Sequence, residues 1–372
     1  MSPAPKPLPP KPYDPAEATR EIVSFAKSLG FALVGVASAS ESRYVRHMTS
    51  WIAEGKHGTM DYLARDEALR FDPRRHLEGT RSFIMVADRY ATRGDVSEAS
   101  TPGQGRIARY ARGRNYHEVM KRRLHKMADA MRIRFPGADF RSFVDTAPVL
   151  ERELAELCGL GWIGRNTMLI HPRVGSYVLL GGAATTLELA VPAEQIRHAD
   201  ACGTCTRCID ACPTGAISPY SVDASRCVSY LTIERRIDVP DQLIAGIGDR
   251  IYGCDVCQEV CPHNSARAEG DGVADVLPAF AVTRISLPIL DVLSWDERTR
   301  REAFTNSAMK RAPLGVMRRN AVIAGFNQIR TDCAGDQHHA IESRIREIAS
   351  DETEDPLVRN AAIKAVESLS KN

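Results

Sequence analysis

Eight of the ten cysteines in this chain lie between Cys202 and Cys261, and their spacing restricts what that segment can fold around. The segment reads Cys202-x2-Cys205-x2-Cys208-x3-Cys212-Pro213, then Cys227, then Cys254-x2-Cys257-x3-Cys261-Pro262. Runs of this type, closed by proline, wrap a loop around an iron–sulfur cubane, and each cubane needs four thiolates. Eight thiolates therefore predict two [4Fe-4S] clusters.

The partition of these ligands is expected to be crossed. In two-cluster ferredoxins the last cysteine of a run ligates the other cluster. The expected ligands of cluster one are Cys202, Cys205, Cys208 and Cys261. Those of cluster two are Cys212, Cys227, Cys254 and Cys257.

Zinc and disulfides are the alternatives for these cysteines. Zinc ribbons pair isolated C-x2-C knuckles and do not use a four-cysteine run closed by proline. Disulfides are disfavoured because no apolar secretory segment precedes the run and a reducing cytosol keeps thiols free. Cys158 and Cys333 stand outside both runs and are interpreted as small buried apolar residues.

Length and charge leave room for several cores and give no global bias toward nucleic acid. The chain has 372 residues, with 49 basic and 47 acidic side chains and a net charge of +2, so any basic surface must be local. No apolar run is long enough to span a bilayer. Residues 1–15 are rich in proline and predict a disordered leader. We expect a cytoplasmic protein without a membrane anchor.

Hydrophobic periodicity predicts an α/β first half and a helical end. Helices are predicted over 17–29 and 42–54, strands over 31–36 and 82–87, and Gly30 is placed at a helix C-terminus. A hairpin is predicted from residues 165–170 and 176–180. After Pro262, helical patterns cover 289–293, 298–308, 315–328, 337–350 and 356–369, the last capped by Asp355 with Pro356 in its first turn. Helices paired in this way predict a short HEAT-type solenoid.

Two local stretches are strongly basic. The segment 106–134 interleaves Tyr110 and Tyr116 with ten basic residues, and a second group lies at 310–319. Such stretches either hold phosphates and stack on planar rings or form solvated helix faces, and the pattern leaves both interpretations open. The candidates for phosphate contacts are Arg112, Arg114, Lys121, Arg122, Lys310, Arg311, Arg318 and Arg319.

Two further motifs need interpretation. Asp145 stands where a strand leads into a helix, so it either caps that helix, with Pro148 in the first turn, or points a carboxylic acid into a site. The run Gly159-x-Gly161-x-x-Gly164 matches a dinucleotide fingerprint but follows a helix and not a strand. We reject the dinucleotide interpretation and assign these glycines to tight turns.

Several segments together resemble one family, the epoxyqueuosine reductases of tRNA modification. They are 108–117 (ARYARGRNYH), 144–152 (VDTAPVLER), 159–167 (GLGWIGRNT), the cysteine run 202–212, 229–234 (SYLTIE) and 253–262 (GCDVCQEVCP). The resemblance extends from about Ile22 into the C-terminal helices. It departs at His263, where the family more often has tryptophan.

The resemblance implies an α/β cobalamin-binding domain related to that of reductive dehalogenases (16–198), a ferredoxin-like two-cluster domain (199–265) and a HEAT-like helical tRNA-binding domain (266–372). It implies an oxidoreductase that reduces the epoxide of epoxyqueuosine at the wobble position of tRNAs with GUN anticodons. Base-off cobalamin is expected, because the nearest match to D-x-H-x-x-G, Asp336-x-His338, has Ile341 in place of glycine. A monomer served by a low-potential donor such as flavodoxin or ferredoxin is expected.

The resemblance also assigns residues. Asp145 corresponds to the proton donor, and to act at neutral pH its pKa is expected to be raised by burial over the corrin. The expected cobalamin contacts are Arg70, Tyr110, Asp145, Asn166, Ser229, Tyr230, Leu231 and Asp255. Two alternatives remain: a cobalamin-dependent reductive dehalogenase, which typically carries a twin-arginine leader, and an iron–sulfur electron carrier without its own catalysis.

Overall fold

An antiparallel sheet forms the centre of the N-terminal half. The computed structural model describes residues 12–92, 101–265, 275–331 and 336–370, so Cys333 and residues 1–11 lie outside the described residues. The sheet has the order β1 (Leu33–Ser38), β2 (Ser82–Arg89), β7 (Val178–Thr185), β4 (Phe140–Phe143), and every neighbouring pair is antiparallel.

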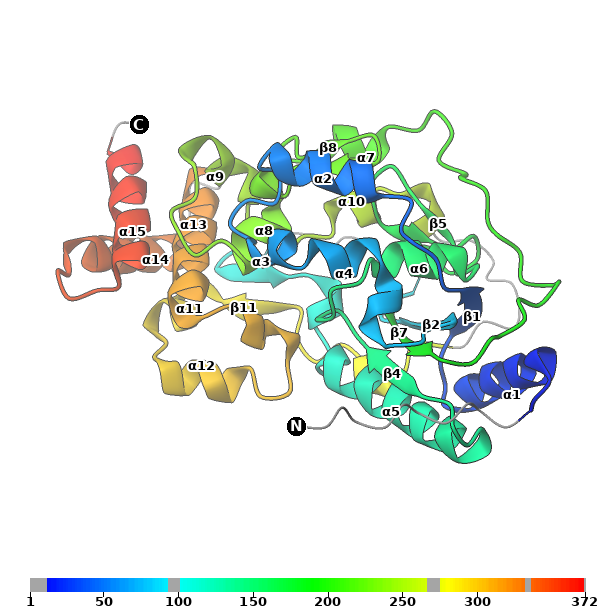
Figure 1. Ribbon diagram of the computed structural model, residues 1–372. Helices are drawn as coiled ribbons and strands as arrows, with labels where there is room; N and C mark the ends of the chain where they lie inside the picture. The colour runs from blue at the N-terminus through cyan, green and yellow to red at the C-terminus, as the bar shows by residue number, and fades with distance from the viewer. Residues whose placement is uncertain (1–11, 93–100, 266–274, 332–335, 371–372) are drawn as a thin grey trace, which may run out of the picture.

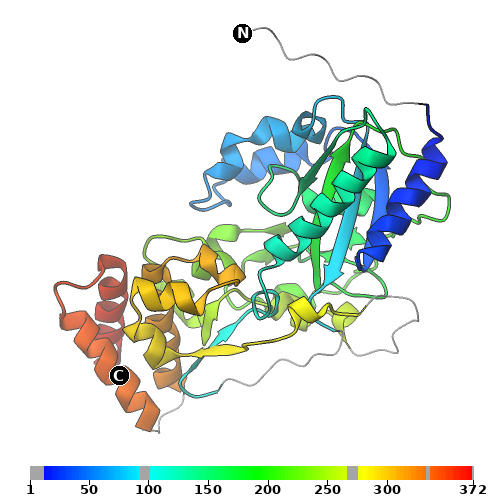
Figure 2. The same ribbon diagram turned by 90° about the horizontal axis from the view of Figure 1, so that it is seen from below.

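Helices cover both faces of this sheet, and strand β2 shows why. All eight of its residues are buried, and alternate side chains point to opposite faces. Ile84 and Val86 pack with α1 (Pro15–Ser28) and α5 (Tyr116–Arg134), whereas Phe83 and Met85 pack with α6 (Glu151–Leu157). The sheet is therefore the middle layer of three (Figure 2).

The elements predicted at the N-terminus are confirmed within a few residues. Helix α1 begins after Asp14, whose side chain accepts from the Glu17 N–H, and ends before Gly30, which has φ of +85°. Helix α2 (Val45–Ala53) and strands β1 and β2 occupy the other predicted positions. The short helices α3 (Tyr62–Arg65), α4 (Glu67–Phe71) and η1 (Pro73–His76) follow α2.

The predicted hairpin of residues 165–170 and 176–180 is wrong. Strand β6 (Leu169–Ile170) pairs with β5 (Trp162–Ile163), and β7 pairs with β2 and β4. Strand β7 pairs with β2 along its whole length and with β4 over residues 182–185, whereas β6 turns back onto the chain just before it. The rejection of a dinucleotide loop is supported, because Gly159 follows α6 and its C-cap residue Cys158, and has φ of +74°.

The cysteine-rich segment has little regular structure of its own. It contains α7 (Arg207–Asp210), β8 (Ile217–Ser218), β9 (Ser221–Val222), η3 (Ala224–Arg226), α8 (Val228–Ile233), α9 (Asp241–Ile247), β10 (Arg250–Tyr252), α10 (Val256–Glu259) and η4 (Pro262–Asn264). Strand β10 pairs with β3 (Gln104–Ile107), which also pairs with β11 (Ser286–Pro288). This small sheet joins all three parts of the chain.

The C-terminal helices stack at one end of the molecule (Figure 1). They are α11 (Ile289–Ser294), α12 (Glu297–Ala303), α13 (Leu314–Thr331), α14 (Asp336–Ser350) and α15 (Pro356–Leu369), with η5 (Pro278–Phe280) and η6 (Ala308–Arg311) in the connections. Helix α13 is buried between α15, α14 and the cysteine-rich segment, as a paired-helix repeat requires. No helix in the described part of the chain is both long and apolar enough to cross a membrane.

The start of α15 offers a stability test. Asp355 accepts from the Leu357 N–H at 2.8 Å, and Pro356 opens the helix, as predicted. Replacing Asp355 with alanine should lower the free energy of unfolding by ~1 kcal/mol, because an N–H of the first helical turn loses its acceptor. Asp355→Asn should unfold like the parent in the same urea titration. An equal loss in both variants would contradict the capping role.

Candidate cofactor and active site

The ligands expected for cluster one surround a single cavity. Cys202, Cys205, Cys208 and Cys261 line a space of about 240 Å³, together with Arg165, Asn166 and Ile170. Helices α7 and α10, which carry Cys208 and Cys257, lie against each other and bring the two cysteine runs together. The nine described cysteines are all free thiols.

A buried indole beside this cavity points toward a cysteine of cluster one. Trp162 is 2% exposed and packs with Cys261 and Cys202, and within the described chain its Nε1 has no acceptor other than the Cys202 sulfur. A buried indole N–H is normally satisfied, and a cluster sulfur at this position would accept from it. The residues around the cavity therefore fit a cluster.

Three of the ligands expected for cluster two, Cys227, Cys254 and Cys257, are strongly desolvated. Cys227 and Cys254 pack against an apolar group that includes Val228 and Leu243. Burial raises the pKa of the Cys254 thiol to about 11 and that of Cys227 above its ordinary value. Buried thiolates need a compensating positive charge, which iron supplies. Cys212 Sγ accepts from the Ala216 N–H at 3.2 Å, which is typical of a cluster ligand.

Asp145 lies at the centre of a second group of side chains. Its carboxylate accepts from His117 Nε2 at 2.8 Å, and the phenol of Tyr116 also donates to it. Tyr110 stacks edge-on against Tyr116 at 6.1 Å between ring centroids and at a tilt against Tyr252 at 6.3 Å. We call this group the Asp145 cluster; its residues are Tyr110, Tyr116, His117, Asp145, Glu151 and Tyr252.

The capping interpretation of Asp145 is wrong. Helix α6 begins at Glu151, and its N-cap residue, Leu150, makes no side-chain capping bond. Asp145 lies six residues earlier in the loop after β4, with φ of +54°. Pro148 likewise lies outside the helix. The carboxylate is thus free for another role.

The pKa of Asp145 is lowered in this structure, and the raised pKa expected when a corrin covers the carboxyl stays a prediction. Desolvation acts to raise the pKa, but the hydrogen bond and charge of His117 and the hydrogen bond from Tyr116 outweigh it, so the pKa is lowered. The side chain is still 55% exposed. The neighbouring carboxyl behaves oppositely: burial, then the charge of Asp145, raises the pKa of Glu151 to about 8.

Arg70 and Arg311 lie near this cluster. The charges of Glu234, Arg311, Asp145 and Arg70 all act on the pKa of Tyr62. These four groups therefore lie around the Tyr62 side chain. Arg70 is 8% exposed and its Nε has no hydrogen-bond partner, which leaves a buried donor aimed at an acceptor that the described chain does not supply. A corrin bears amide oxygens that could accept from it, so this residue fits the expected cofactor.

The other expected cobalamin contacts do not gather with Asp145. Asn166 Nδ2 donates to the Cys257 carbonyl, and Asp255 accepts from the Arg109 N–H at 2.7 Å, so both side chains support the cluster loops. Ser229 lies on α8, and the Tyr230 hydroxyl accepts from the Thr59 N–H. Leu231 is fully buried in the apolar group beside Cys227, and its expected contact with cobalamin stays a prediction.

Two of the arginines expected to contact phosphates are buried and serve the fold. Arg112 is 5% exposed and its Nε donates to the Ile107 carbonyl. Arg319 is 1% exposed and donates to the carbonyls of Leu231, Arg235 and Ile237. Both assignments are wrong, because a guanidinium that is buried and hydrogen-bonded inside the protein cannot reach a backbone phosphate.

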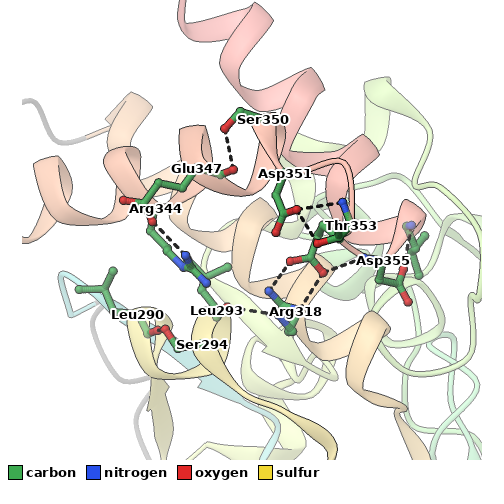
Figure 3. A network of polar contacts seen from close by, with 12 residues as sticks. Leu290, Leu293, Ser294, Arg318, Arg344, Glu347, Ser350, Asp351, Thr353 and Asp355 are labelled. Carbon is green, nitrogen blue, oxygen red and sulfur yellow. Dashed lines mark hydrogen bonds and ion pairs between the residues drawn. The ribbon is translucent and has the colours of Figure 1, made fainter.

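The remaining basic residues differ in how free their side chains are to contact a phosphate. Arg318 forms a two-pronged pair with Glu354 and donates to the Leu293 carbonyl (Figure 3). Arg311 pairs with Glu234 and Lys310 with Glu118, although both are half-exposed. Arg114, Lys121 and Arg122 are exposed at the start of α5, beside the Asp145 cluster.

Sequence reasoning missed three members of this region. Tyr62, Tyr252 and Glu234 come from α3, β10 and the end of α8, segments that meet only in three dimensions. A fourth, Glu151, lies within the motif 144–152, in which sequence reasoning assigned a role to Asp145 alone. A signal was present, since Tyr252 stands two residues before Cys254 and Glu151 six residues after Asp145.

Comparisons with known proteins agree with this geometry. Residues 70–146 match the family model described as epoxyqueuosine reductase QueG, DUF1730, and residues 201–264 match the 4Fe-4S double cluster binding domain. The epoxyqueuosine reductase of Pseudomonas aeruginosa is 38% identical over 291 residues, which cover 77% of this chain and 79% of that protein. That of Burkholderia pseudomallei is 34% identical, covering 92% and 90%.

Solved structures give the same result. The crystal structure of an epoxyqueuosine reductase with an epoxyqueuosine-modified tRNA-Tyr stem loop has a TM-score of 0.81 at 26% identity, covering 94% of this chain and 89% of that one. The Streptococcus thermophilus enzyme also has a TM-score of 0.81, at 25% identity, with coverage of 95% and 90%.

Fold and site together define an oxidoreductase with a double [4Fe-4S] cluster domain. More particularly, the chain belongs to the epoxyqueuosine reductase family.

Proposed function

We propose that this protein reduces the epoxide of epoxyqueuosine at the wobble position of tRNA to give queuosine. The observation that carries the proposal is the Asp145 cluster, a hydrogen-bonded acid and imidazole pair held in a strained loop beside exposed basic residues. Removing the epoxide oxygen as water takes two electrons and two protons, so the site must deliver both. Family membership and the likeness to a tRNA-bound relative support this assignment.

The chain's own residues divide the work. When bound, cobalamin supplies a strongly nucleophilic low-valent cobalt for breaking the carbon–oxygen bond. Arg70, with its unpartnered Nε, and Tyr110 would help to hold it. Asp145 delivers a proton to the departing oxygen, and His117, 2.8 Å away, is placed to return a proton to Asp145.

Electrons enter through cluster one. The thiols of Cys202 and Cys208 lie in shallower positions than those of Cys227 and Cys257, so a small carrier such as flavodoxin or ferredoxin would meet cluster one first. Cluster two follows, with Tyr252 of the Asp145 cluster two residues before its ligand Cys254. The protein is proposed to act as a monomer in the cytoplasm.

The ligand partition can be tested one cluster at a time. Cys202→Ser should damage cluster one more than cluster two, because Cys202 lines the cavity assigned to cluster one. Cys227→Ser should do the reverse. Iron analysis and EPR of the reduced variants measure this, and identical losses in the two variants would contradict the crossed partition.

Binding of tRNA can be tested on the exposed residues at the start of α5. Removing charge with Lys121→Ala and Arg122→Ala should weaken tRNA binding and flatten its salt dependence, by a log–log slope of roughly 0.7 to 0.9 for each phosphate that is no longer neutralised. The matched control is the double variant Arg20→Ala and Lys27→Ala on α1, where both residues are also exposed. An unchanged slope in the α5 variant would assign these residues to a solvated helix face.

The proton donor can be tested by Asp145→Asn. This change keeps the size of the side chain and removes the transferable proton, so both clusters and the corrinoid should be retained. Single-turnover conversion of epoxyqueuosine-tRNA by chemically reduced enzyme should fall by roughly two to four orders of magnitude. Near-normal conversion would move the donor's role to His117, Tyr110 or water.

A further inference from the structure

The backbone of Asp145 has a strained conformation, which requires stabilising contacts from the surrounding residues. Its φ of +54° lies in the left-handed region, which residues with a side chain seldom adopt. Such conformations persist where the surroundings over-determine them, and they gather at functional sites. The loop from 144 to 150 leaves β4 and leads to α6 without any helix or strand of its own.

One side chain outside the loop fixes the backbone of Asp145. The Asp145 N–H donates to Glu151 Oε1 at 2.6 Å. Within the described chain, the loop's other backbone–backbone hydrogen bonds run from Thr146 to Val144, from Val149 to Ala147, and at its far end from the Leu154 N–H of α6 to the Leu150 carbonyl. His117 fixes the carboxylate instead, so backbone and side chain are held by different residues.

Glu151 is well placed for this contact. It is the first residue of α6, and its side chain turns back toward the loop, while the N-cap position has no side-chain cap. Burial and the charge of Asp145 raise its pKa to about 8, so at neutral pH it is mostly protonated. A neutral carboxyl accepts the N–H without placing a second negative charge against Asp145.

We propose that Glu151 is a positioning residue that holds Asp145 in its proton-donating place through the backbone N–H of Asp145. Glu151 acts on the reaction through Asp145 alone, so the inference rests on the proposed function of Asp145. It assigns a role to the second carboxyl of the motif 144–152, and it predicts that the two residues act as one unit.

A double-mutant cycle on the loaded enzyme tests this. Glu151→Ala and Glu151→Asp both leave the N–H without an acceptor within reach, and each should slow single-turnover conversion by about tenfold to a hundredfold, the scale of a misplaced catalytic group. Glu151→Gln keeps an acceptor oxygen and should stay within about threefold of the parent. Binding of tRNA, cluster content and corrinoid content should be unchanged in all three. In the Asp145→Asn background, Glu151→Ala should cause no further loss.

The contrary outcomes are distinct. If Glu151→Ala slows the Asp145→Asn enzyme by the same factor as the parent, Glu151 acts independently of Asp145 and the proposal is overturned. Full-speed conversion by both Glu151→Ala and Glu151→Asp would overturn it as well. If Glu151→Ala fails to fold, the comparison of Glu151→Asp with Glu151→Gln still tests the proposal. Equal conversion rates in these two variants would overturn it. Normal conversion by Asp145→Asn alone would instead remove the proton-donor role itself, and this inference with it.

Discussion

A buried pair on α13, Arg319 and Asn320, holds together the segments that carry the second cluster's ligands. Asn320 Nδ2 donates to the carbonyls of Thr232 and Ile251, which lie in α8, after Cys227, and in β10, before Cys254. Thr232 Oγ1 in turn accepts from the Gly253 N–H. Burial lowers the pKa of Arg319 to about 10, and its guanidinium donates to carbonyls in α8 and on the chain after it. The C-terminal helices therefore hold in place a cysteine-rich segment that has little secondary structure of its own. The two parts share one hydrophobic core, which includes Ile233, Ile251 and Tyr252.

Contacts between segments far apart in the chain also explain which features could be predicted from the sequence and which could not. Cluster ligands and the cap at Asp355 depend on spacing along the chain, so local chemistry was enough to predict them. The pairing of β6 with β5, in place of a hairpin with β7, goes with the placement of β7 between β2 and β4 in the main sheet, which no local pattern reveals. The burial of Arg319 was missed for a similar reason: a basic residue in a basic stretch looks like surface until its acceptors, some eighty residues away, are known.

The Asp145 cluster shows how neighbouring acids can be given different protonation states. Asp145 receives hydrogen bonds from His117 and Tyr116, which favour its anion, whereas Glu151 is desolvated and faces that anion, which favours its neutral form. The sequence pointed to Asp145, whose catalytic role stays a prediction, but not to its hydrogen bonds or its backbone conformation, because these depend on residues from α5 and α6. An anion that is hydrogen-bonded to an imidazole is also a group that can receive a proton and pass it on.

The proposed conversion of epoxyqueuosine in tRNA to queuosine can be observed directly in the nucleosides of the tRNA. The measurement is mass spectrometry of tRNA carrying epoxyqueuosine, after incubation with anaerobically purified protein loaded with cobalamin and both clusters and supplied with a low-potential reductant. We expect the epoxyqueuosine signal to decline while queuosine, lighter by one oxygen atom, increases in equal amount. Unchanged epoxyqueuosine in the presence of fully loaded, reduced protein would contradict the proposed function.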